Sequence, residues 1–120
     1  MSAAADLCAR IAAGERAFAD LDLAGADLSR IDLSDATFEN CDFNGADLTA
    51  TKLASAAWRR CRAGGANFKA VDADSAAFAN CNLANTDWSG ARLASASFED
   101  CKLTGADFRD TKLLGIAFKN

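Results

Sequence analysis

Four cysteines recur every twenty residues, and their side chains are the ones in this sequence best suited to chemistry. They are Cys41, Cys61, Cys81 and Cys101, while Cys8 lies outside the series. Thiolates bind soft metals and form disulfides. A metal, however, needs ligands that converge on one point, and a disulfide needs Cβ atoms about 3.8 Å apart. Residues at a long, constant spacing form a line in a regular structure. We therefore expect the four cysteines to fill space as small apolar side chains.

The rest of the composition argues against catalysis. The 120 residues suit one domain, and they include no histidine, the usual general base and the commonest metal ligand. No glycine-rich phosphate loop leads into a helical pattern. Paired carboxylates such as Asp72 and Asp74 lie in a stretch that predicts no cleft to desolvate them. We predict that the protein is not an enzyme and binds no cofactor.

A five-residue repeat runs beneath the cysteine spacing, from residue 16 to residue 120, without an insertion or deletion. The third residue of each pentad is Leu, Phe or Trp, except at Ala63 and Ala73. The first residue is Ala, Cys, Thr, Val or Ile, except at Arg16 and Leu21. Neither a helix, with period 3.6, nor a flat strand, with period 2, produces this pattern. It predicts a solenoid in which the first and third residues point inward and the last two turn a corner.

The spacing of twenty then has a structural meaning, because four pentads close one square coil. Residues twenty apart stack in adjacent coils at about 4.8 Å, the distance between β-strands. The cysteines form one such column. A second column is aromatic throughout, and its members are Phe18, Phe38, Trp58, Phe78, Phe98 and Phe118. Different columns thus select different residue types, which supports closure at twenty residues.

Ala63 and Ala73 are weak points in one coil, since the coils on either side carry Phe or Leu at the same positions. An alanine in place of a large buried side chain costs roughly 2–5 kcal/mol when nothing fills the space. We expect Phe68, Phe78 or Val71 to fill it, and a ligand cavity is the alternative.

Four segments share one motif: GADLS, GADLT, GANFK and GADFR, at residues 25–29, 45–49, 65–69 and 105–109. In them the chain resembles the pentapeptide repeat family, whose repeat is A(D/N)LXX, and the resemblance extends over residues 16–120. It implies an all-β fold, a right-handed quadrilateral β-helix of about five coils. Some members of this family resemble B-form DNA in shape and charge, bind DNA gyrase and confer fluoroquinolone resistance.

Residues 1–15 do not follow the repeat, and we expect them to form a helical cap on the first coil. Ser2 suits a helix N-cap and Gly14 suits the end of the helix. Between them Ala4, Leu7, Ile11 and Ala12 form an apolar stripe. The segment has no leader pattern, no stretch could span a bilayer, and an odd number of cysteines favours reduced thiols. These features predict a cytoplasmic protein that does not enter the membrane.

One outward column is acidic. Asp27, Asp47, Asp87 and Asp107 take the second pentad position on one side of the coil, and Asn67 interrupts them. In the simpler interpretation these side chains bond backbone amides at the turns and keep the rod soluble. In the other, they form a face that binds a partner.

The charge is unevenly distributed along the chain. Residues 1–50 carry ten acidic and three basic side chains, whereas residues 51–120 carry seven acidic and ten basic ones. Four of the basic residues lie near the middle, at Lys52, Arg59, Arg60 and Arg62. A DNA mimic should be acidic along its whole length, so the pattern fits mimicry only in part.

The last coil breaks the polar pattern. Leu114 stands at a normally polar position, Ile116 replaces the alanine of its column, and Phe118 ends the aromatic column. An uncovered coil with extra apolar side chains is an association surface. We predict a homodimer through this end, as the resemblance also implies. The alternative is that Leu114 and Ile116 fold over their own coil.

These observations favour a non-catalytic protein-binding or scaffold module. Its partner is expected to be a protein rather than nucleic acid, because a net charge of −4 opposes phosphate binding. The alternative, taken from the resemblance, is a DNA-mimicking modulator of DNA gyrase or another topoisomerase.

Overall fold

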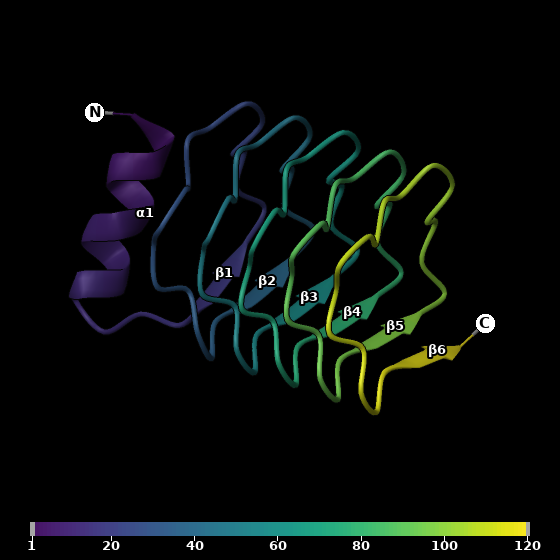
Figure 1. The fold of residues 1–120 in the computed structure, drawn as a ribbon. Coiled ribbons are helices and arrows are strands. Elements are labelled where there is room, and N and C mark those ends of the chain that lie inside the picture. The colour runs from purple at the N-terminus through teal and green to yellow at the C-terminus, as the bar shows by residue number, and fades with distance from the viewer. Residues whose placement is uncertain (1, 120) are drawn as a thin grey trace.

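A computed structural model describes residues 2–119 and shows a parallel-strand solenoid of about five coils with one short helix at its N-terminal end (Figure 1). Helix α1 spans Ala3–Ala12. Six strands follow in one parallel sheet, in chain order: β1 (Ala17–Ala19), β2 (Thr37–Glu39), β3 (Ala57–Arg59), β4 (Ala77–Ala79), β5 (Ser97–Glu99) and β6 (Ala117–Lys119). The outermost residues of the predicted cap and repeat, Met1 and Asn120, lie outside the described residues.

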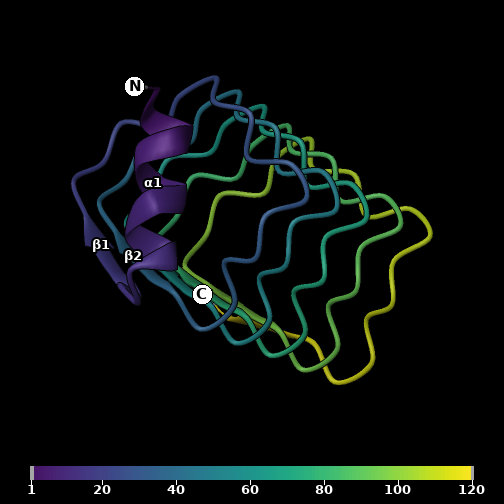
Figure 2. The same ribbon diagram turned by 90° about the vertical axis from the view of Figure 1, so that its left-hand side faces the viewer.

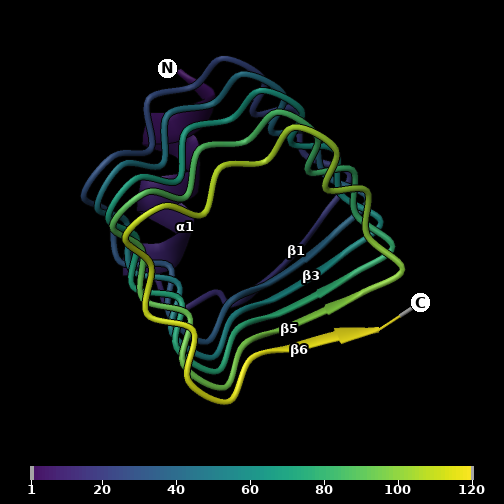
Figure 3. The same cartoon turned by 45° about the vertical axis from the view of Figure 1, so that its right-hand side comes forward.

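Residues twenty apart pair in register, as the column pattern predicts. Phe18 pairs with Phe38 in β1 and β2, and Phe98 pairs with Phe118 in β5 and β6. The other three sides of the coil are joined by isolated bridges at the second pentad position. Four-sided coils therefore stack into a rod of 36 × 22 × 21 Å (Figure 3). The predicted β-helical fold is confirmed.

Each corner of the coil lies at a fifth pentad position, where the backbone is left-handed. Every fifth residue from Asp20 to Gly115 has a positive φ, although most of these residues are not glycine. At many corners the amide of the next residue donates to the third-position carbonyl, as Ala26 does to Leu23 at 3.1 Å, which closes a type II turn. This conformation costs a non-glycine residue about 1–2 kcal/mol, so ladder bonds on both sides must hold it.

The sheet side of the coil turns its corner differently. Among the described residues no such turn bond follows a strand. The fifth-position amide bonds to the next coil here, as Asn40 does to the carbonyl of Arg59 at 2.9 Å, and also on other sides, as Gly25 does to the carbonyl of Asn44 at 2.8 Å. The missing turn bond is therefore what distinguishes this side, where, among the described residues, strands of three residues form.

The aromatic column packs behind the sheet, with successive ring centroids 5.0–5.5 Å apart. Trp58 also stacks on Phe43, with the ring centroids 4.1 Å apart. Phe43 lies one coil before Ala63 in the same column. The indole of Trp58 therefore lies over Phe43, where Ala63 contributes only a methyl group. The sequence pattern did not identify Trp58 as the residue that fills this space.

Helix α1 lies across the open face of the first coil (Figure 2). Ser2 is its N-cap and accepts a hydrogen bond from the amide of Ala5 at 3.1 Å, and Gly14 follows its end with a positive φ, as predicted. Leu7 is buried in the core, and the guanidinium carbon of Arg10 lies 4.8 Å from the ring centroid of Phe18. The helix thus covers the apolar side chains that the first coil exposes.

Candidate interaction surfaces

The cysteine column lies inside the rod. Cys41, Cys61 and Cys81 are buried, Cys101 is half-buried, and all are free thiols. Cys61 donates a hydrogen bond from Sγ to the carbonyl of Phe38 in the preceding coil at 3.4 Å. The next two cysteines repeat this contact one coil further on each time. No three His, Cys, Asp or Glu side chains of residues 2–119 form a group that could hold a metal ion. These thiols therefore belong to the packing of the core.

The acidic column is continuous on one outer side of the rod. Parallel backbone β-bridges join each member of this column to the next, in the order Asp27, Asp47, Asn67, Asp87 and Asp107. Each carboxylate accepts a hydrogen bond from the amide two residues later, such as Ser29 to Asp27 at 3.0 Å. Asn67 does the same with its amide oxygen, at 2.9 Å from the Lys69 nitrogen. The column thus has the turn-stabilising bonds of the simpler interpretation.

These hydrogen bonds favour the ionised carboxylates. The pKa of Asp27 is lowered because Ser29 donates from both its hydroxyl and its amide. The pKa of Asp87 is lowered mainly by the amide of Ser89, and that of Asp107 by the Arg109 side chain. Asp27, Asp87 and Asp107 therefore stay charged over the whole physiological range.

The two halves of the acidic column differ in their neutralisation. Asp87 has Lys69 Nζ at 3.6 Å, and Asp107 has Arg109 Nη2 at 2.8 Å. Among the described residues, neither Asp27 nor Asp47 forms an ion pair with a basic side chain. Uncompensated negative charge on this side is therefore confined to the N-terminal coils.

The basic residues of the middle coils do not form one patch, because they lie on different sides of the rod. The backbone of Lys52 forms β-bridges with Asp32 and Asp72 on one side of the coil. The backbone of Arg62 forms a β-bridge with Asp42 on another side. Arg59 and Arg60 lie on the sheet side, where Arg60 pairs with Glu39 at 2.7 Å. The sequence placed these residues correctly along the rod but left their directions open.

The last described coil is open to solvent. Leu114 and Phe118 are exposed and Ile116 is half-buried against the core. Leu113 is exposed as well, which extends the apolar surface that the sequence pattern assigned to this end. The three predicted residues therefore lie close to one end of the rod, opposite helix α1 (Figure 1).

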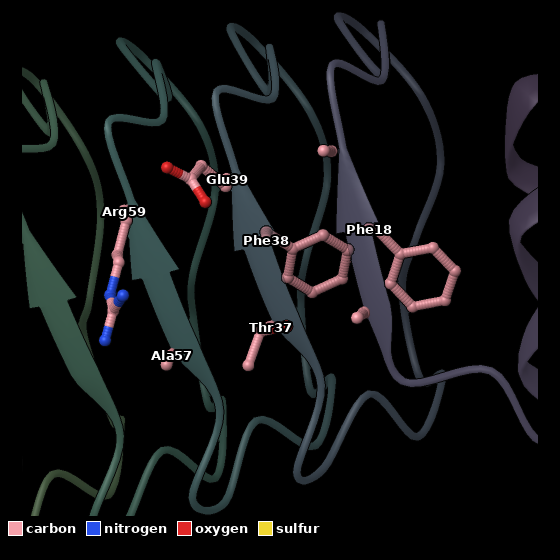
Figure 4. Close-up of a pocket in the computed structure, with 8 residues that line it drawn as sticks. Phe18, Thr37, Phe38, Glu39, Ala57 and Arg59 are labelled. Carbon is pink, nitrogen blue, oxygen red and sulfur yellow. The ribbon is translucent and has the colours of Figure 1, made fainter.

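The sequence pattern missed the outer face of the β1–β6 sheet. Its outward residues are small at the second pentad position and mostly charged at the fourth, where Glu39, Arg59, Glu99 and Lys119 stand. A comparison of fourth-position residues twenty apart would have found them. A groove of about 300 Å³ crosses strands β1, β2 and β3 on this face, with Glu39 and Arg59 among its lining residues (Figure 4).

A β-solenoid built from uninterrupted pentads defines a class of repeat protein, and comparison with known families agrees. The model of the pentapeptide repeat region matches residues 15–76, and that of pentapeptide repeats (8 copies) matches residues 74–110. The chain belongs to the pentapeptide repeat family. A search of curated proteins found no match.

Solved structures of the same family are similar to this chain. One is a pentapeptide repeat protein from the thylakoid lumen of Arabidopsis thaliana, with 26% identity, a TM-score of 0.79, and coverage of 85% of this chain and 72% of that one. Another comes from the cyanobacterium Cyanothece 51142, with 19% identity, a TM-score of 0.56, and coverage of 95% and 94%. At that identity it shows the fold alone.

A third is a trypsin-treated variant of QnrB1, a plasmid-mediated fluoroquinolone resistance protein. It has 26% identity and a TM-score of 0.52, over 83% of this chain. The present chain spans 61% of that structure's length.

Among the helices described for the present protein, none is long and apolar enough to cross a membrane.

Proposed function

We propose that this protein is a non-catalytic module that binds another protein through the acidic side of its N-terminal coils. The observation that supports the proposal is the set of exposed or half-exposed carboxylates there that have no basic partner within 4 Å among residues 2–119. On the acidic column they are Asp27 and Asp47, while Asp22, Asp32 and Asp42 are unpaired in other columns of the same coils. The partner that fits is a protein with a basic surface.

The rod presents these charges with little conformational freedom. Turn hydrogen bonds fix the carboxylates, and the coil spacing sets them about 4.8 Å apart. A preorganised surface loses little side-chain entropy on binding, and complementary charge accelerates association. We propose the cytoplasm as the compartment, because all five cysteines are free thiols.

The test uses a substitution that the chain itself contains. Asn67 keeps the turn bond without the charge, so Asp27→Asn with Asp47→Asn should remove two charges and preserve the coil. The matched control is Asp87→Asn with Asp107→Asn, where the charges are already paired. Proteins that the immobilised chain retains from an extract would be quantified for all three forms.

A protein retained by the parent and the control, and reduced at least tenfold with the first variant, would support the proposal. Capture that is equal for all three forms would contradict it, since binding would then not depend on the unpaired acidic side. Circular dichroism of each variant checks that the fold is intact.

Modulation of DNA gyrase or another topoisomerase is the alternative. The similarity to QnrB1 favours it, together with the acidic coils. A supercoiling assay with a fluoroquinolone would separate the two. Protection of gyrase by the parent, lost in the Asp27→Asn/Asp47→Asn variant, would support mimicry. Absence of any effect at micromolar protein would leave the protein-binding module.

We also propose a homodimer that forms end to end through the last coil. The exposed Leu114 and Phe118 support it, because burial of such side chains stabilises an interface. Sedimentation of the parent and of Leu114→Asp tests this proposal. Association through the end that Leu114→Asp weakens is expected, and a parent that stays monomeric would contradict it.

A further inference from the structure

The outer face of the β1–β6 sheet carries mostly small side chains. Its second-position column contains no charged or aromatic residue: Ala17, Thr37, Ala57, Ala77, Ser97 and Ala117. Among the described residues, only this side of the coil forms strands of three residues rather than isolated bridges. Another flat surface can therefore approach its backbone closely.

The fourth-position column of the same face carries charges in a symmetrical order of opposite sign. From β2 to β6 it runs Glu39, Arg59, Ala79, Glu99 and Lys119. One strand away from Ala79 on either side stand Arg59 and Glu99, which have opposite charges. Two strands away stand Glu39 and Lys119, which also have opposite charges.

The neighbouring fifth-position column has the same symmetry. Arg60 and Asp100 stand at equal distances on either side of Asn80. A two-fold axis along β4 would therefore set Arg59 and Arg60 of one chain against Glu99 and Asp100 of another, and Glu39 against Lys119.

From this charge symmetry we infer that the sheet face binds a second copy of this chain, side by side and antiparallel, about a two-fold axis at β4. In such an interface each pair of residues occurs twice, so the two columns supply six complementary pairs. Because the axis lies along the strand direction, fourth-position residues of one chain meet fourth-position residues of the other.

Four of the six charges on this face are available for such contacts, and the other two would exchange an exposed pair within the chain for pairs with the second copy. Among residues 2–119, Arg59, Glu99 and Lys119 form no ion pair, and the pair between Arg60 and Glu39 is exposed. The acidic side of the rod offers a contrast, since Asp27, Asp47, Asp87 and Asp107 would repel the same column of a second copy. The sheet face therefore has charges that attract the same face of a second copy, whereas the acidic side has charges that repel it.

The groove on this face lies where the proposed partner brings its last two strands. It crosses β1 to β3, and the two-fold axis places the partner's β6 and β5 over β2 and β3. The outward side chains at the partner's β6 are only an alanine and a lysine. Figure 4 shows Glu39 and Arg59 on neighbouring strands of the groove, where they would meet the partner's lysine and glutamate.

The contact area indicates a weak dimer. The rod is about 22 Å wide. Five strands about 4.8 Å apart extend roughly 24 Å, which gives about 500 Å² per chain and about 1,000 Å² in total. This total is near the lower limit for specific interfaces. Association is therefore expected to depend on concentration and to weaken in high salt, which screens the charge pairs.

Sedimentation equilibrium of the full chain, from about 10 μM to about 1 mM, tests the inference. Arg59→Glu and Glu99→Arg, each alone, place like charges opposite each other twice, and each should weaken the dimer at least tenfold. An equimolar mixture of the two variants should dimerise like the parent, because every contact between unlike variants is again complementary. Arg59→Glu combined with Glu99→Arg in one chain should restore the parent's dimer too.

Lys102→Glu, an exposed charge reversal on another side of the coil, is the control and should leave the dimer unchanged. A parent that is monomeric up to the highest concentration overturns the inference. A dimer that Leu114→Asp dissociates and Arg59→Glu does not also overturns it, because association would then be end to end. Failure of the mixture to dimerise excludes the antiparallel arrangement.

Discussion

The two ends of the rod are built from the same repeat and differ in what covers them. At the N-terminal end helix α1 lies over the first coil, and Leu7 and Phe18 are 1% and 3% exposed. At the other end Leu114 and Phe118 are 85% and 54% exposed. Phe18 and Phe118 nevertheless stack on the next aromatic ring at the same centroid distance, 5.4 Å. The difference shows that stacking within the column does not itself bury its terminal members.

A β-solenoid exposes apolar side chains at each end, because each coil is covered only by the coils next to it. A short amphipathic helix covers the N-terminal end with Leu7, with the partly buried Ala4 and Ile11, and with the Arg10 guanidinium, which lies over the Phe18 ring. The last coil has no such segment among the described residues. Its apolar side chains are therefore the ones most available to another molecule.

The largest expected effect comes from truncating the two terminal aromatic residues. Phe18→Ala should lower the free energy of unfolding by about 4 kcal/mol, because it leaves a cavity beneath the helix. Phe118→Ala should lower it by about 1 kcal/mol, because half of that side chain already faces water. Urea denaturation followed by circular dichroism measures both. Equal losses would show that the two ends do not differ in stability.

A second change isolates the helix. Leu7→Ala should cost about 3 kcal/mol, since the leucine is fully buried against the first coil. Leu114→Ala, the matched change at the open end, should cost less than about 0.5 kcal/mol. Hydrogen exchange at the amides of β1 and β6 provides the measurement. Faster exchange in β1 with Leu7→Ala is expected, and unchanged exchange there would mean that the helix does not stabilise the first coil.

A smaller effect on stability is expected at a corner in the middle of the rod, where neither end is involved. Ala70 occupies a left-handed corner with φ +57°, far from both ends. Ala70→Gly should stabilise the protein by about 0.5 kcal/mol, because relief of the strained backbone outweighs the extra entropy of the unfolded chain. Ala77→Gly, at an extended position in β4, is the control and should destabilise. A loss of stability in Ala70→Gly would show that the corner is not strained.

The smallest expected effect is the contribution of Glu15 to the pH dependence of stability. The pKa of Glu15 is lowered from its ordinary value of 4.5, mainly by the hydrogen bond from Arg10, which joins the helix to the segment after it. A carboxyl whose folded pKa is lowered stabilises the fold above its unfolded pKa and loses this contribution as pH falls through the folded value. NMR titration should therefore give a Glu15 midpoint below 4.5. Arg10→Ala should return it to the ordinary value, and a midpoint unaffected by Arg10→Ala would contradict this role for the ion pair.

Much of the fold could be predicted because the repeat has no insertion. The third-position residues from Phe18 to Phe118 determined the inward direction, and the cysteine spacing determined the number of sides. The identity of the residue that fills the space around Ala63 was not predictable, because it depends on the rotamer that Trp58 adopts over Phe43. The sequence also placed the acidic column on one side, while the pairing of Asp87 and Asp107 depended on side-chain directions.

The sheet face was missed for a related reason. Its charges stand at the fourth pentad position, which on the other sides of the coil belongs to a turn. Only the structure shows that the corner after each strand omits the turn bond and keeps that residue extended.

For this protein, the sequence alone determined the period, the inward residues and the coil of twenty, because burial of apolar side chains at a fixed spacing leaves few alternatives. The tertiary structure decided which sides are flat and which charges are paired. Those properties arise from contacts between neighbouring coils, and no local pattern of residues specifies them.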